Sequence, residues 1–480
     1  MHAGIDDSVA DIETLTKRGR SAQADWARLS IRERGRALRR LAERLRSDEE
    51  LAGLISSETG KPAFEALGFE LAYVSEIVRF LTGRLGRSAL ATGMRSSLIL
   101  PHKRARVVWK PRGLVAVIGP FNFPLLNNFG DAVAPLLAGN SVILKPSPHT
   151  PRTSLRVAAL WRELKLPEGV FQVAPGGPDV GSALVDACDM AFFTGSVAAG
   201  RKVSARAGER LIPCVAELGG KSAMIVLADA DLKAAARAAV WGAFAGAGQV
   251  CIRVERVLVE QGAADEFVRL VLAETAKLRV GGGSEFDVGP VQLAAQMERY
   301  RAQIDDAVAR GARLLAGGSV REELPGNFFN PTVLDHVPPE AMVAREETFG
   351  PILPIVRVAD RDQAVRLTNA AGLGLSGSVW SRDTQAAEAV AGRLATGSVC
   401  INDVLVNYFF VGAPLGAATG AGLGFRHGPE ALRQFCYPQT VVADRPGLGF
   451  LARWIRKQLG FPYRRRALDV LRWLMKVVYR

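Results

Sequence analysis

The sequence predicts an α/β fold, in which helices cover the faces of parallel β-sheets. Two features support this prediction: four short apolar runs, and helical segments that separate them. Short apolar runs are typical of parallel strands, which are buried on both faces. The runs are residues 114–118, 141–145, 169–173 and 190–193. Strands that alternate with helices form a sheet that binds its ligand at the carboxyl edge.

Residues 11–85 and residues 101–109 are predicted to have different secondary structure. Residues 11–85 are predicted to be helical, because apolar residues recur on one face. In Leu38-Arg-Arg-Leu41-Ala-Glu-Arg-Leu45, for example, the leucines share a side and the charges face away. Residues 101–109 mix basic and β-branched residues, which predicts an extended arm.

A second α/β unit is predicted from residue 219 to about residue 404. Its strand candidates are residues 255–259, 354–358 and 376–380, with a helical segment at 363–370. Residues 412–435 are rich in Gly and Ala, and we expect them to return over the mouth of the active site. A chain of 480 residues is too long for one small core, so two or three packed units are expected.

Composition limits the class of protein. Apolar content of 48% and charged content of 23% are typical of a globular protein. Five cysteines, without a Cys-x-x-Cys pair, argue against a disulfide framework and for a reducing, cytoplasmic setting. The five histidines are scattered without metal-ligand spacing, so we expect no metal. The N-terminus has no charged segment followed by an apolar stretch, so we expect no signal peptide.

The net charge of +13 is concentrated at the C-terminus. Residues 444–480 hold ten of the 61 Lys and Arg residues but two of the 48 Asp and Glu residues. Their net charge is therefore +8, which leaves +5 for the rest of the chain. This distribution does not fit a nucleic-acid footprint over the whole protein, so we expect no nucleic-acid partner.

Residues 444–480 form a basic tail that is predicted to contain two amphipathic helices. Pro462 separates them, because proline breaks a helix. The two apolar faces consist of Phe450, Leu451, Trp454, Ile455 and Leu459, and of Leu468, Leu471, Leu474, Met475 and Val478. Neither is long enough to span a bilayer. Two interpretations remain open: peripheral contact with an anionic membrane, or packing on its own or a neighbouring subunit.

A cysteine and a glutamate stand in small-residue settings where a substrate can approach. Cys251 ends the stretch Gly246-Ala-Gly-Gln-Val-Cys251, and Glu217 begins Glu217-Leu-Gly-Gly-Lys-Ser222. A thiol and a carboxylate are the side chains that an enzyme needs to form a covalent acyl intermediate and hydrolyse it. Each alone is weak support, because a lone cysteine is more often a small buried hydrophobe.

Further motifs surround this pair in a fixed order. They are Gly119-Pro-Phe-Asn122-Phe-Pro124, Gly139-Asn-Ser-Val-Ile-Leu-Lys145-Pro146, Phe193-Thr-Gly195-Ser196 with Gly200, Glu346-Glu347-Thr-Phe349-Gly-Pro351, and Pro414-Leu-Gly. The ordered set resembles the NAD(P)-dependent aldehyde dehydrogenase superfamily, from about Glu58-Thr-Gly-Lys-Pro62 to about Tyr437. The resemblance implies the aldehyde dehydrogenase fold, with a Rossmann-like cofactor domain, an α/β catalytic domain and a small β oligomerisation arm.

The resemblance also implies how the chain is divided. The expected parts are a cofactor domain (1–100 and 110–218), a catalytic domain (219–406), an oligomerisation arm (101–109 and 436–443) and the tail (444–480). In this family the arm builds oligomers, so we expect a homodimer or a homotetramer.

Catalytic roles follow for three residues. The resemblance implies that Cys251 attacks a small-molecule aldehyde as a thiolate, and that Asn122 and the Cys251 N–H stabilise the oxyanion. It implies that Glu217 activates the water that releases the acid. Relatives that pass the acyl group to coenzyme A generally lack this glutamate, so we expect hydrolysis.

The resemblance implies NAD or NADP as cofactor. The implied binding residues are Lys145, Ser147, Gly195, Ser196, Glu347 and Phe349. No Gly-x-Gly-x-x-Gly motif is present; instead, the Gly195-Ser196 turn opens a helix whose N–H groups can face a pyrophosphate. Taken alone, that turn is an ordinary helix N-cap. Pro148 stands where NAD-preferring relatives often place a glutamate, so we expect NADP to be tolerated or preferred.

Two substrate classes remain open. The stretches around Asn402-Asp403 and Gly424-Phe-Arg-His-Gly428 look most like a bacterial succinate-semialdehyde dehydrogenase-like branch. A dicarboxylic semialdehyde needs a cation, for which Arg253 is the candidate, although a surface or interface salt bridge would equally explain it. The aromatic residues Phe121, Phe123, Phe409 and Phe410 indicate a tunnel for a broad range of apolar aldehydes, which we favour. A catalytically silent structural member of the fold is a third possibility, against which the joint presence of Cys251, Glu217 and Asn122 counts.

Overall fold

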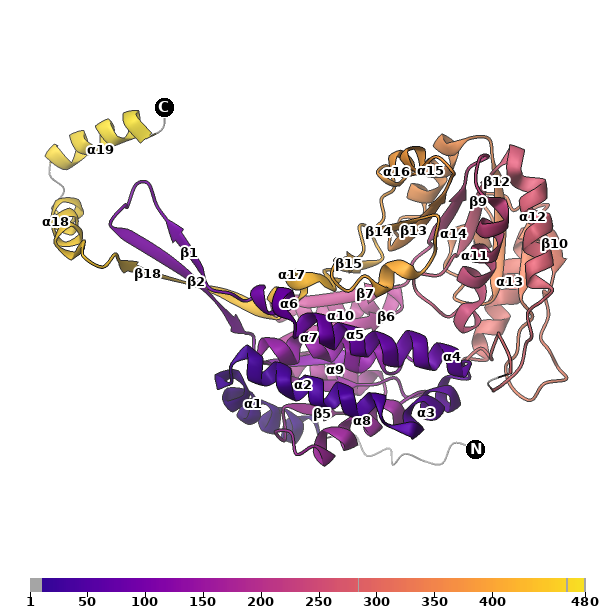
Figure 1. Cartoon of the computed structure of the whole chain (residues 1–480), viewed down its shortest axis with the longest axis horizontal. Coiled ribbons are helices and arrows are strands. Elements are labelled where there is room, and N and C mark those ends of the chain that lie inside the picture. The colour runs from indigo at the N-terminus through magenta and orange to yellow at the C-terminus, as the bar shows by residue number, and fades with distance from the viewer. Residues whose placement is uncertain (1–10, 284, 463–464, 479–480) are drawn as a thin grey trace.

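The computed structural model describes residues 11–283, 285–462 and 465–478. It contains two helix-covered sheets that lie next to each other and a β arm that projects from them (Figure 1). Two helices lie at the outer end of the arm (Figure 1). The α/β class predicted from the sequence is therefore confirmed.

The first sheet has six strands in the order β16-β7-β6-β3-β4-β5. Their bounds are β3 (Leu114–Ile118), β4 (Ser141–Lys145), β5 (Phe171–Val173), β6 (Met190–Gly195), β7 (Cys214–Leu218) and β16 (Gly422–Leu423). All neighbours are parallel except β16, which runs antiparallel to β7 and pairs Gly422 with Glu217. The predicted strand at 169–173 begins two residues late, because Gly169 has a φ of +79° and cannot extend the ladder.

Helices cover this sheet and include the predicted helical region 11–85. They are α1 (Ile12–Arg28), α2 (Ile31–Arg46), α3 (Glu49–Thr59), α4 (Ala63–Glu65), α5 (Tyr73–Leu81), α6 (Arg84–Ser88), α7 (Asp131–Ala138), α8 (Arg152–Glu163), α9 (Pro178–Ala187) and α10 (Val197–Glu209), with π-helical turns η1 (Ala66–Ala72) and η2 (Leu126–Gly130). In α2 the predicted leucines Leu38, Leu41 and Leu45 are all buried. A capping box of Ser30 and Glu33 fixes the start of that helix.

The second sheet has seven strands in the order β10-β11-β12-β9-β8-β13-β14, and only β10 is antiparallel to its neighbour among the described strands. The strands are β8 (Ala223–Val226), β9 (Arg256–Glu260), β10 (Arg313–Ala316), β11 (Thr332–Asp335), β12 (Ile352–Val358), β13 (Ser376–Trp380) and β14 (Ser398–Ile401). The helices are α11 (Leu232–Phe244), α12 (Gln261–Thr275), α13 (Ala295–Ala309), α14 (Met342–Arg345), α15 (Arg361–Ala370) and α16 (Thr384–Ala391), with 3-10 turns η3 (Ala245–Gly248) and η4 (Val406–Phe409). The predicted second α/β unit is therefore present.

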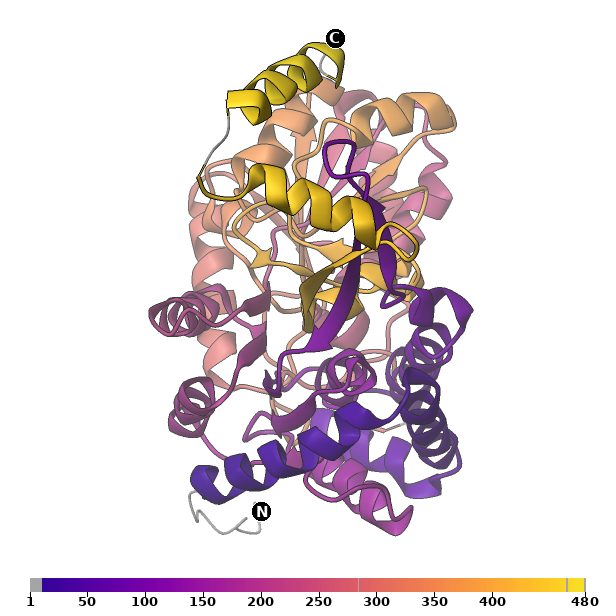
Figure 2. The same ribbon diagram turned by 90° about the vertical axis from the view of Figure 1, so that its left-hand side faces the viewer.

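The arm is a three-stranded antiparallel sheet, seen from its end in Figure 2. It consists of β1 (Gly93–Ser96), β2 (Lys103–Pro111) and β18 (Cys436–Asp444). Strand β18 pairs with β2 over its full length, with Thr440 opposite Val107. The predicted pairing of residues 101–109 with a late strand is confirmed.

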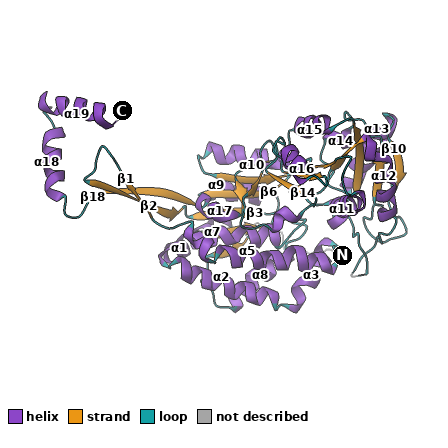
Figure 3. Ribbon diagram, turned by 45° about the horizontal axis from the view of Figure 1, so that its top comes forward, coloured by secondary structure: helices purple, strands orange, loops and turns teal. Residues whose placement is uncertain are grey.

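The last part of the chain links the sheets, the arm and the tail. Between η4 and β18 lie β15 (Leu415–Gly416), β17 (Phe425–Arg426) and α17 (Gly428–Gln434). The tail forms α18 (Gly449–Leu459) and α19 (Arg465–Val478), as predicted (Figure 3). The side chains of Leu459, Leu474 and Val478, three of the predicted apolar face, lie outside the described set. None of the described helices is both long and apolar enough to cross a membrane.

Candidate active site

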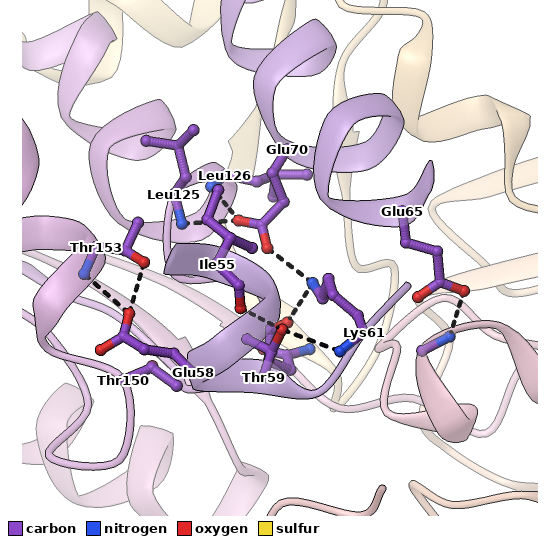
Figure 4. Close-up of polar contacts among 12 residues, drawn as sticks. Ile55, Glu58, Thr59, Lys61, Glu65, Glu70, Leu125, Leu126, Thr150 and Thr153 are labelled. Atoms are coloured by element: carbon purple, nitrogen blue, oxygen red, sulfur yellow. Dashed lines mark hydrogen bonds and ion pairs between the residues drawn. The ribbon is translucent and has the colours of Figure 1, made fainter. Parts of the chain in front are cut away.

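Cys251 follows a tight left-handed loop that the small residues before it make possible. Gly246, Ala247 and Gly248 have φ values of +59°, +54° and +72°. A Cβ on Gly248 would lie 2.2 Å from the carbonyl oxygen of Gly350, so the loop packs against the segment after Phe349. Glu65 Oε1 accepts a hydrogen bond of 2.9 Å from the Gly246 N–H (Figure 4). The motif therefore fixes the backbone on which the thiol stands.

Asn122 lies in the loop after β3 and points toward the Cys251 loop. Its Nδ2 donates to the carbonyl oxygen of Gln249 at 2.8 Å. Lys61 Nζ holds the Asn122 carbonyl at 2.8 Å and the Glu70 carboxylate at 2.7 Å, and all three residues are buried. Glu70 in turn accepts the Leu125 N–H, 2.7 Å from its Oε2 (Figure 4). Residues from the N-terminal helices thus position the Asn122 loop.

Glu217 stands near the end of β7 and is buried. Burial is the main reason that its pKa is raised to about 7, against which the nearby Arg426 guanidinium acts. The shortest distance between them is 3.8 Å, from Arg426 Nε to Glu217 Oε1. Neither of these two atoms has a hydrogen-bond partner among the described residues. A carboxyl group with a pKa near 7 can change its protonation state at neutral pH.

Arg426 is the centre of a buried polar cluster behind Glu217. It pairs with Asp131 at 3.4 Å, donates to Asn127 Oδ1 at 2.6 Å and Thr194 Oγ1 at 3.1 Å, and contacts the Tyr408 hydroxyl. Burial raises the pKa of Asp131 to about 6, and Arg426 opposes that shift. The cluster keeps one buried cation among two buried carboxyl groups.

The Cys251 thiol is only partly exposed. Burial raises its pKa to about 11; Arg426 opposes this, whereas Glu217 and Glu347 add to it. In this state the sulfur is therefore a thiol at neutral pH, and the balance of charges around it controls how readily it ionises.

A cleft of about 560 Å³ opens at the carboxyl edge of the first sheet, where its lining includes Asn122, Glu217 and Cys251. Every predicted cofactor residue also lines it: Lys145, Ser147, Gly195, Ser196, Glu347 and Phe349. Its other cations are Lys202 and Arg299. Among the residues described, the acidic ones in the lining are Glu217 and Glu347. A cleft with largely apolar walls and three cations among its described residues fits a pyrophosphate-containing dinucleotide.

The cofactor residues are presented by strand ends and a helix start. Ser196 caps α10 by accepting a hydrogen bond from the Ala199 N–H, so both the predicted N-cap and the predicted helix start are present. Lys145 Nζ, at the end of β4, donates to the carbonyls of Pro146 and Gly176 at 2.7 and 2.9 Å, and burial lowers its pKa to about 8. A Cβ on Gly219 would lie 2.0 Å from Glu347 Oε1, so glycine lets Glu347 approach the end of β7.

A second hollow, apolar and narrower, meets the cleft at Cys251 and Asn127, which line both. Its other lining residues are Phe69, Phe123, Leu126, Val250, Ile252, Leu405, Tyr408 and Phe409. Phe69 packs against Phe409 and Trp241 with centroid distances of 6.1 Å, which gives the hollow an aromatic mouth. The predicted positions of Phe123 and Phe409 therefore agree with the structure. Phe121 does not belong to this hollow: it lines the cleft, edge-on to Phe349. Phe410 is not among the lining residues either.

Arg253 does not reach either hollow, which overturns its candidacy as a carboxylate anchor. It is fully buried, donates to Glu255 Oε1 at 2.8 Å and to the Ile352 carbonyl at 2.6 Å. Although burial would raise it, the pKa of Glu255 is lowered to about 2 by Lys221 and Arg253. Glu255 also accepts the Phe349 N–H at 3.0 Å. Arg253 does form a salt bridge, but the pair is buried inside the chain and not at a surface or interface as expected, and it holds the loop that presents Phe349.

Sequence reasoning missed the role of Arg426 and of Lys61. Both lie in motifs that the sequence comparison quoted, Gly424-Phe-Arg-His-Gly428 and Glu58-Thr-Gly-Lys-Pro62. The local sequence does not show that Arg426 lies beside Glu217, because the two residues are far apart in the chain. The pairing of β16 with β7 brings their segments together. Residues 412–435 were expected to return over the mouth of the active site; Arg426 of this segment instead lies behind Glu217, and none of these residues lines the cleft or the hollow.

The other cysteines and the histidines add no further site. All five cysteines are free. Within the described part of the chain, no group of three or more His, Cys, Asp or Glu side chains is placed to hold a metal ion.

The fold and the cleft define a class: an oxidoreductase with a dinucleotide-type cleft that ends at a cysteine. The model of the aldehyde dehydrogenase family matches residues 5–441. The chain belongs to the aldehyde dehydrogenase family, whose enzymes use NAD or NADP, and it is an oxidoreductase of that class.

Relatives and solved structures agree with this assignment. The 4,4'-diapolycopene aldehyde oxidase of Methylomonas sp is 38% identical over 97% of this chain and 87% of that protein. A Mycobacterium tuberculosis protein with the provisional name succinate-semialdehyde dehydrogenase (NADP(+)) 2 is 36% identical over 98% and 91%. The crystal structure of the NAD-dependent aldehyde dehydrogenase from Sinorhizobium meliloti superposes with a TM-score of 0.86, at 33% identity over 91% of this chain and 88% of that one. The structure of a Mycobacterium tuberculosis aldehyde dehydrogenase complexed with NAD+ gives 0.85, at 32% identity over 91% and 90%.

Proposed function

We propose that this protein oxidises an apolar aldehyde to the carboxylic acid with NAD(P)+, through a covalent intermediate on Cys251. The observation that carries the proposal is the position of Cys251, which lines both the cleft and the apolar hollow. A thiol at this junction can meet an aldehyde from one side and a cofactor from the other.

In the first step, the Cys251 sulfur attacks the aldehyde carbon and forms a thiohemiacetal. The thiol proton leaves to bulk water, because the attacking form is the thiolate, and Glu217 stays ionised for the later hydrolysis. The oxygen that becomes negative receives N–H donors from the Asn122 amide and the Cys251 backbone. The Asn122 amide has two N–H groups, of which one holds the Gln249 carbonyl, so the second is available for this oxygen.

Oxidation and hydrolysis complete the reaction. NAD(P)+ in the cleft would supply the acceptor for the hydride of the same carbon, and Cys251 would then hold the acyl group as a thioester. Glu217 then takes a proton from water, the resulting hydroxide attacks the thioester, and the acid and the free thiol are released. Lys145, Ser196 and Glu347 would hold the dinucleotide, and Phe349 would limit the position of its nicotinamide. Because Glu217 is present, transfer to coenzyme A is the less favoured outcome.

The lining of the hollow supports an apolar substrate. Among the described residues around it, no Lys, Arg or His side chain is present to receive a second carboxylate. Arg426 contacts the Tyr408 hydroxyl beneath the hollow, but Asp131 and Asn127 already occupy it. Succinate semialdehyde, for which the Mycobacterium tuberculosis relative is named, is the alternative substrate. A catalytically silent protein is disfavoured by the joint presence of Cys251, Glu217 and Asn122 beside the cleft.

We also propose that NADP is accepted at least as well as NAD. Pro148 and His149 line the cleft next to Lys145 and Ser147, and Pro148 carries no group that would repel a 2′-phosphate. The expected result for Pro148→Glu is a rise in KM for NADP of about tenfold or more, with a much smaller change for NAD, because the new carboxylate faces the phosphate. Initial rates with both coenzymes measure it, and Pro178→Glu on another part of the cleft is the control. Equal loss with both coenzymes would contradict the idea.

Assembly and compartment follow from other observations. The arm, by resemblance to the family, supports a homodimer or homotetramer, and five free cysteines support a reducing, cytoplasmic setting.

The test of the function is coenzyme reduction with a medium-chain alkanal and with succinate semialdehyde, each with NAD and NADP. We expect turnover of the alkanal with the higher kcat/KM, no requirement for coenzyme A, and loss of turnover in Cys251→Ala. Cys400→Ala, at another buried cysteine, is the matched control. Higher kcat/KM for the semialdehyde would reverse the substrate proposal, and no turnover of any aldehyde would favour the silent alternative.

A further inference from the structure

The two tail helices expose large apolar side chains away from both sheets. They lie at the outer end of the arm in two views (Figures 1 and 3). The exposed fractions are 66% for Phe450, 58% for Trp454, 62% for Trp473 and 62% for Met475. Large apolar side chains gathered on one surface mark a site of contact with another molecule or a membrane. This surface, which we call the tail face, therefore needs a partner.

Each tail helix separates its apolar residues from its basic ones. At about 100° per residue, Phe450, Leu451, Trp454 and Ile455 fall on one half of α18, and Arg453, Arg456 and Lys457 fall on the other. On α19 a wide apolar arc faces a narrow strip. The arc holds Leu468, Val470, Leu471, Trp473, Met475 and Val477, with Arg466 of the first turn between Trp473 and Val477. The strip holds Arg465, Arg472 and Lys476, together with Asp469. A helix with this division, with tryptophan on its apolar side, is of the kind that lies flat in a bilayer interface.

The tail is attached to its own subunit only near its start, within the described residues. The Arg445 N–H donates to the carbonyl of His102 at 2.8 Å, and Arg456 pairs with Asp444 at 3.1 Å. Ala452 is the buried residue of α18. The Arg445 contact holds the start of the tail at the turn between β1 and β2, the Arg456–Asp444 pair joins two residues of the tail, and the tail face is left open. Phe450, Trp454, Trp473 and Met475 therefore do not pack on their own subunit, whereas Leu451 and Ile455 are half-buried.

Charge decides between a second copy of the chain and a membrane. The tail carries +8 and the rest of the chain +5, so a second copy has no excess of negative charge to offer. Two tail faces that met would also bring together two charges of +8. Anionic lipid headgroups supply the opposite charge, and each Lys or Arg at such a surface increases binding roughly fivefold.

We infer that the tail face docks this protein onto the surface of an anionic lipid bilayer. The apolar arcs enter the interface and the basic strips contact the headgroups, while the sheets stay in water. The inference stands apart from the proposed reaction, because it uses none of the active-site residues. The family model ends at residue 441, but the alignment with the Methylomonas relative covers 97% of this chain and so extends into the tail.

The test is co-sedimentation of the full chain with vesicles of phosphatidylcholine and phosphatidylglycerol (3:1), beside vesicles of phosphatidylcholine alone. An apolar variant carries Trp454→Ser, Trp473→Ser and Met475→Ser, and a basic variant carries Arg453→Gln, Arg465→Gln, Arg472→Gln and Lys476→Gln. The matched controls replace exposed residues of the body: Leu85→Ser, Leu211→Ser and Val308→Ser, or Arg32→Gln, Lys165→Gln, Arg301→Gln and Arg313→Gln. Analytical ultracentrifugation gives the oligomeric mass of each protein.

We expect binding to the anionic vesicles that weakens with salt, and a loss of more than about tenfold in both tail variants but in neither control. The oligomeric mass should be the same in all five proteins. Absence of binding to anionic vesicles, or equal binding by the tail variants, overturns the inference. A lower oligomeric mass in the apolar variant also overturns it, because the tail face would then be an interface between subunits. Activity on a water-soluble aldehyde is measured separately, so failure of the proposed reaction would not affect this result.

Discussion

Glu217 is a buried carboxyl group that must lose its proton to act as a base. Its pKa is raised to about 7 by burial, so the fraction that is ionised falls about tenfold for each pH unit below that value. We therefore expect kcat to rise with pH up to about 7 and then to level. Initial rates under saturating substrate between pH 5.5 and 9 measure this, and a kcat that is flat across this range would contradict the assignment.

Glu217→Gln separates the two chemical steps. Without the base, the thioester forms but is hydrolysed slowly, so we expect a burst of about one coenzyme reduced per subunit and a steady-state rate at least about a hundredfold lower. Glu346→Gln, at an exposed neighbour of the cleft, is the control and should show neither effect. Loss of the burst together with the steady state would mean that Glu217 acts before hydride transfer.

Arg426 lies behind Glu217 and influences which groups of the active site are ionised. It favours the ionised forms of Glu217, Asp131 and Cys251. In Arg426→Met we expect alkylation of Cys251 by iodoacetamide at pH 8 to slow by about tenfold and the acidic limb of the kcat profile to move to higher pH, because each pKa rises. Arg426→Lys should restore part of both.

Loss of the cation also leaves two buried carboxyl groups without a partner, which can destabilise the fold. The double variant Asp131→Asn/Arg426→Met removes one of them and keeps the experiment interpretable. An unchanged alkylation rate in a folded Arg426→Met protein would show that Arg426 serves packing alone.

At the scale of single residues, the sequence identified side chains that chemistry demands and missed those that support them. Cys251, Glu217 and Asn122 stand in motifs, and the structure brings all three to one cleft. Arg253 was misjudged because its position near Cys251 in the chain says nothing about the direction of its side chain, which is held by Glu255. Arg426 was not recognised because its partners come from three distant segments.

Among the elements, the loop of residues 246–248 depends most on its residue types. Gly248→Ala would place a Cβ 2.2 Å from the Gly350 carbonyl at a φ of +72°. We expect a loss of about 2 kcal/mol or more in the free energy of unfolding, and a large loss of activity, because Cys251 and the Phe349 segment are displaced together. Thermal or urea unfolding and kcat measure the two effects.

Gly311→Ala is the matched control for that variant. Gly311 has a φ of +101°, but nothing lies within 4 Å of the added Cβ. The control therefore reports the backbone strain alone, on the order of 1 kcal/mol. Equal destabilisation by both substitutions would mean that the contact with Gly350 contributes nothing.

Hydrophobic periodicity predicted which helices and strands are present better than it predicted their first and last residues. The apolar runs at β3 and β4 and the leucine face of α2 were found because burial dictates their pattern. The short strands β15, β16 and β17 could not be predicted, since two residues carry no period. β16 pairs with β7 of the first sheet, whereas β15 and β17 pair with each other.

At the scale of the whole molecule, the arm offers an exposed strand for assembly. Val441 and Val442 of β18 are 40% and 59% exposed. If the arm joins subunits, as proposed, Val441→Asp/Val442→Asp should lower the oligomeric mass, because two charges would be buried in the contact. Light scattering of the purified protein measures this. Val308→Asp, at a valine that is 45% exposed on α13, should leave the mass unchanged; a change in neither protein would remove the arm from the interface.

The architecture of two sheets and an arm was predictable because the motif order is characteristic of one family, and the tail was predictable from its charge and its amphipathic pattern. The partner of the tail could not be predicted, because the sequence of an amphipathic helix fits a subunit surface and a bilayer equally well. In the single chain most of the large apolar side chains described on α18 and α19 are exposed, and the vesicle experiment distinguishes a bilayer from a neighbouring subunit as their partner.

The pairing of β16 with β7 has a consequence for folding and activity during synthesis of the chain. A chain is made from its N-terminus, and its early segments can fold while later ones are still being synthesised. The five parallel strands of the first sheet are complete at residue 218, yet β7 remains an edge, and Glu217 and Asp131 lack their cation, until residues 422–426 arrive. A nascent chain can therefore hold a nearly finished cofactor sheet without a working catalyst, and activity begins only near the end of synthesis.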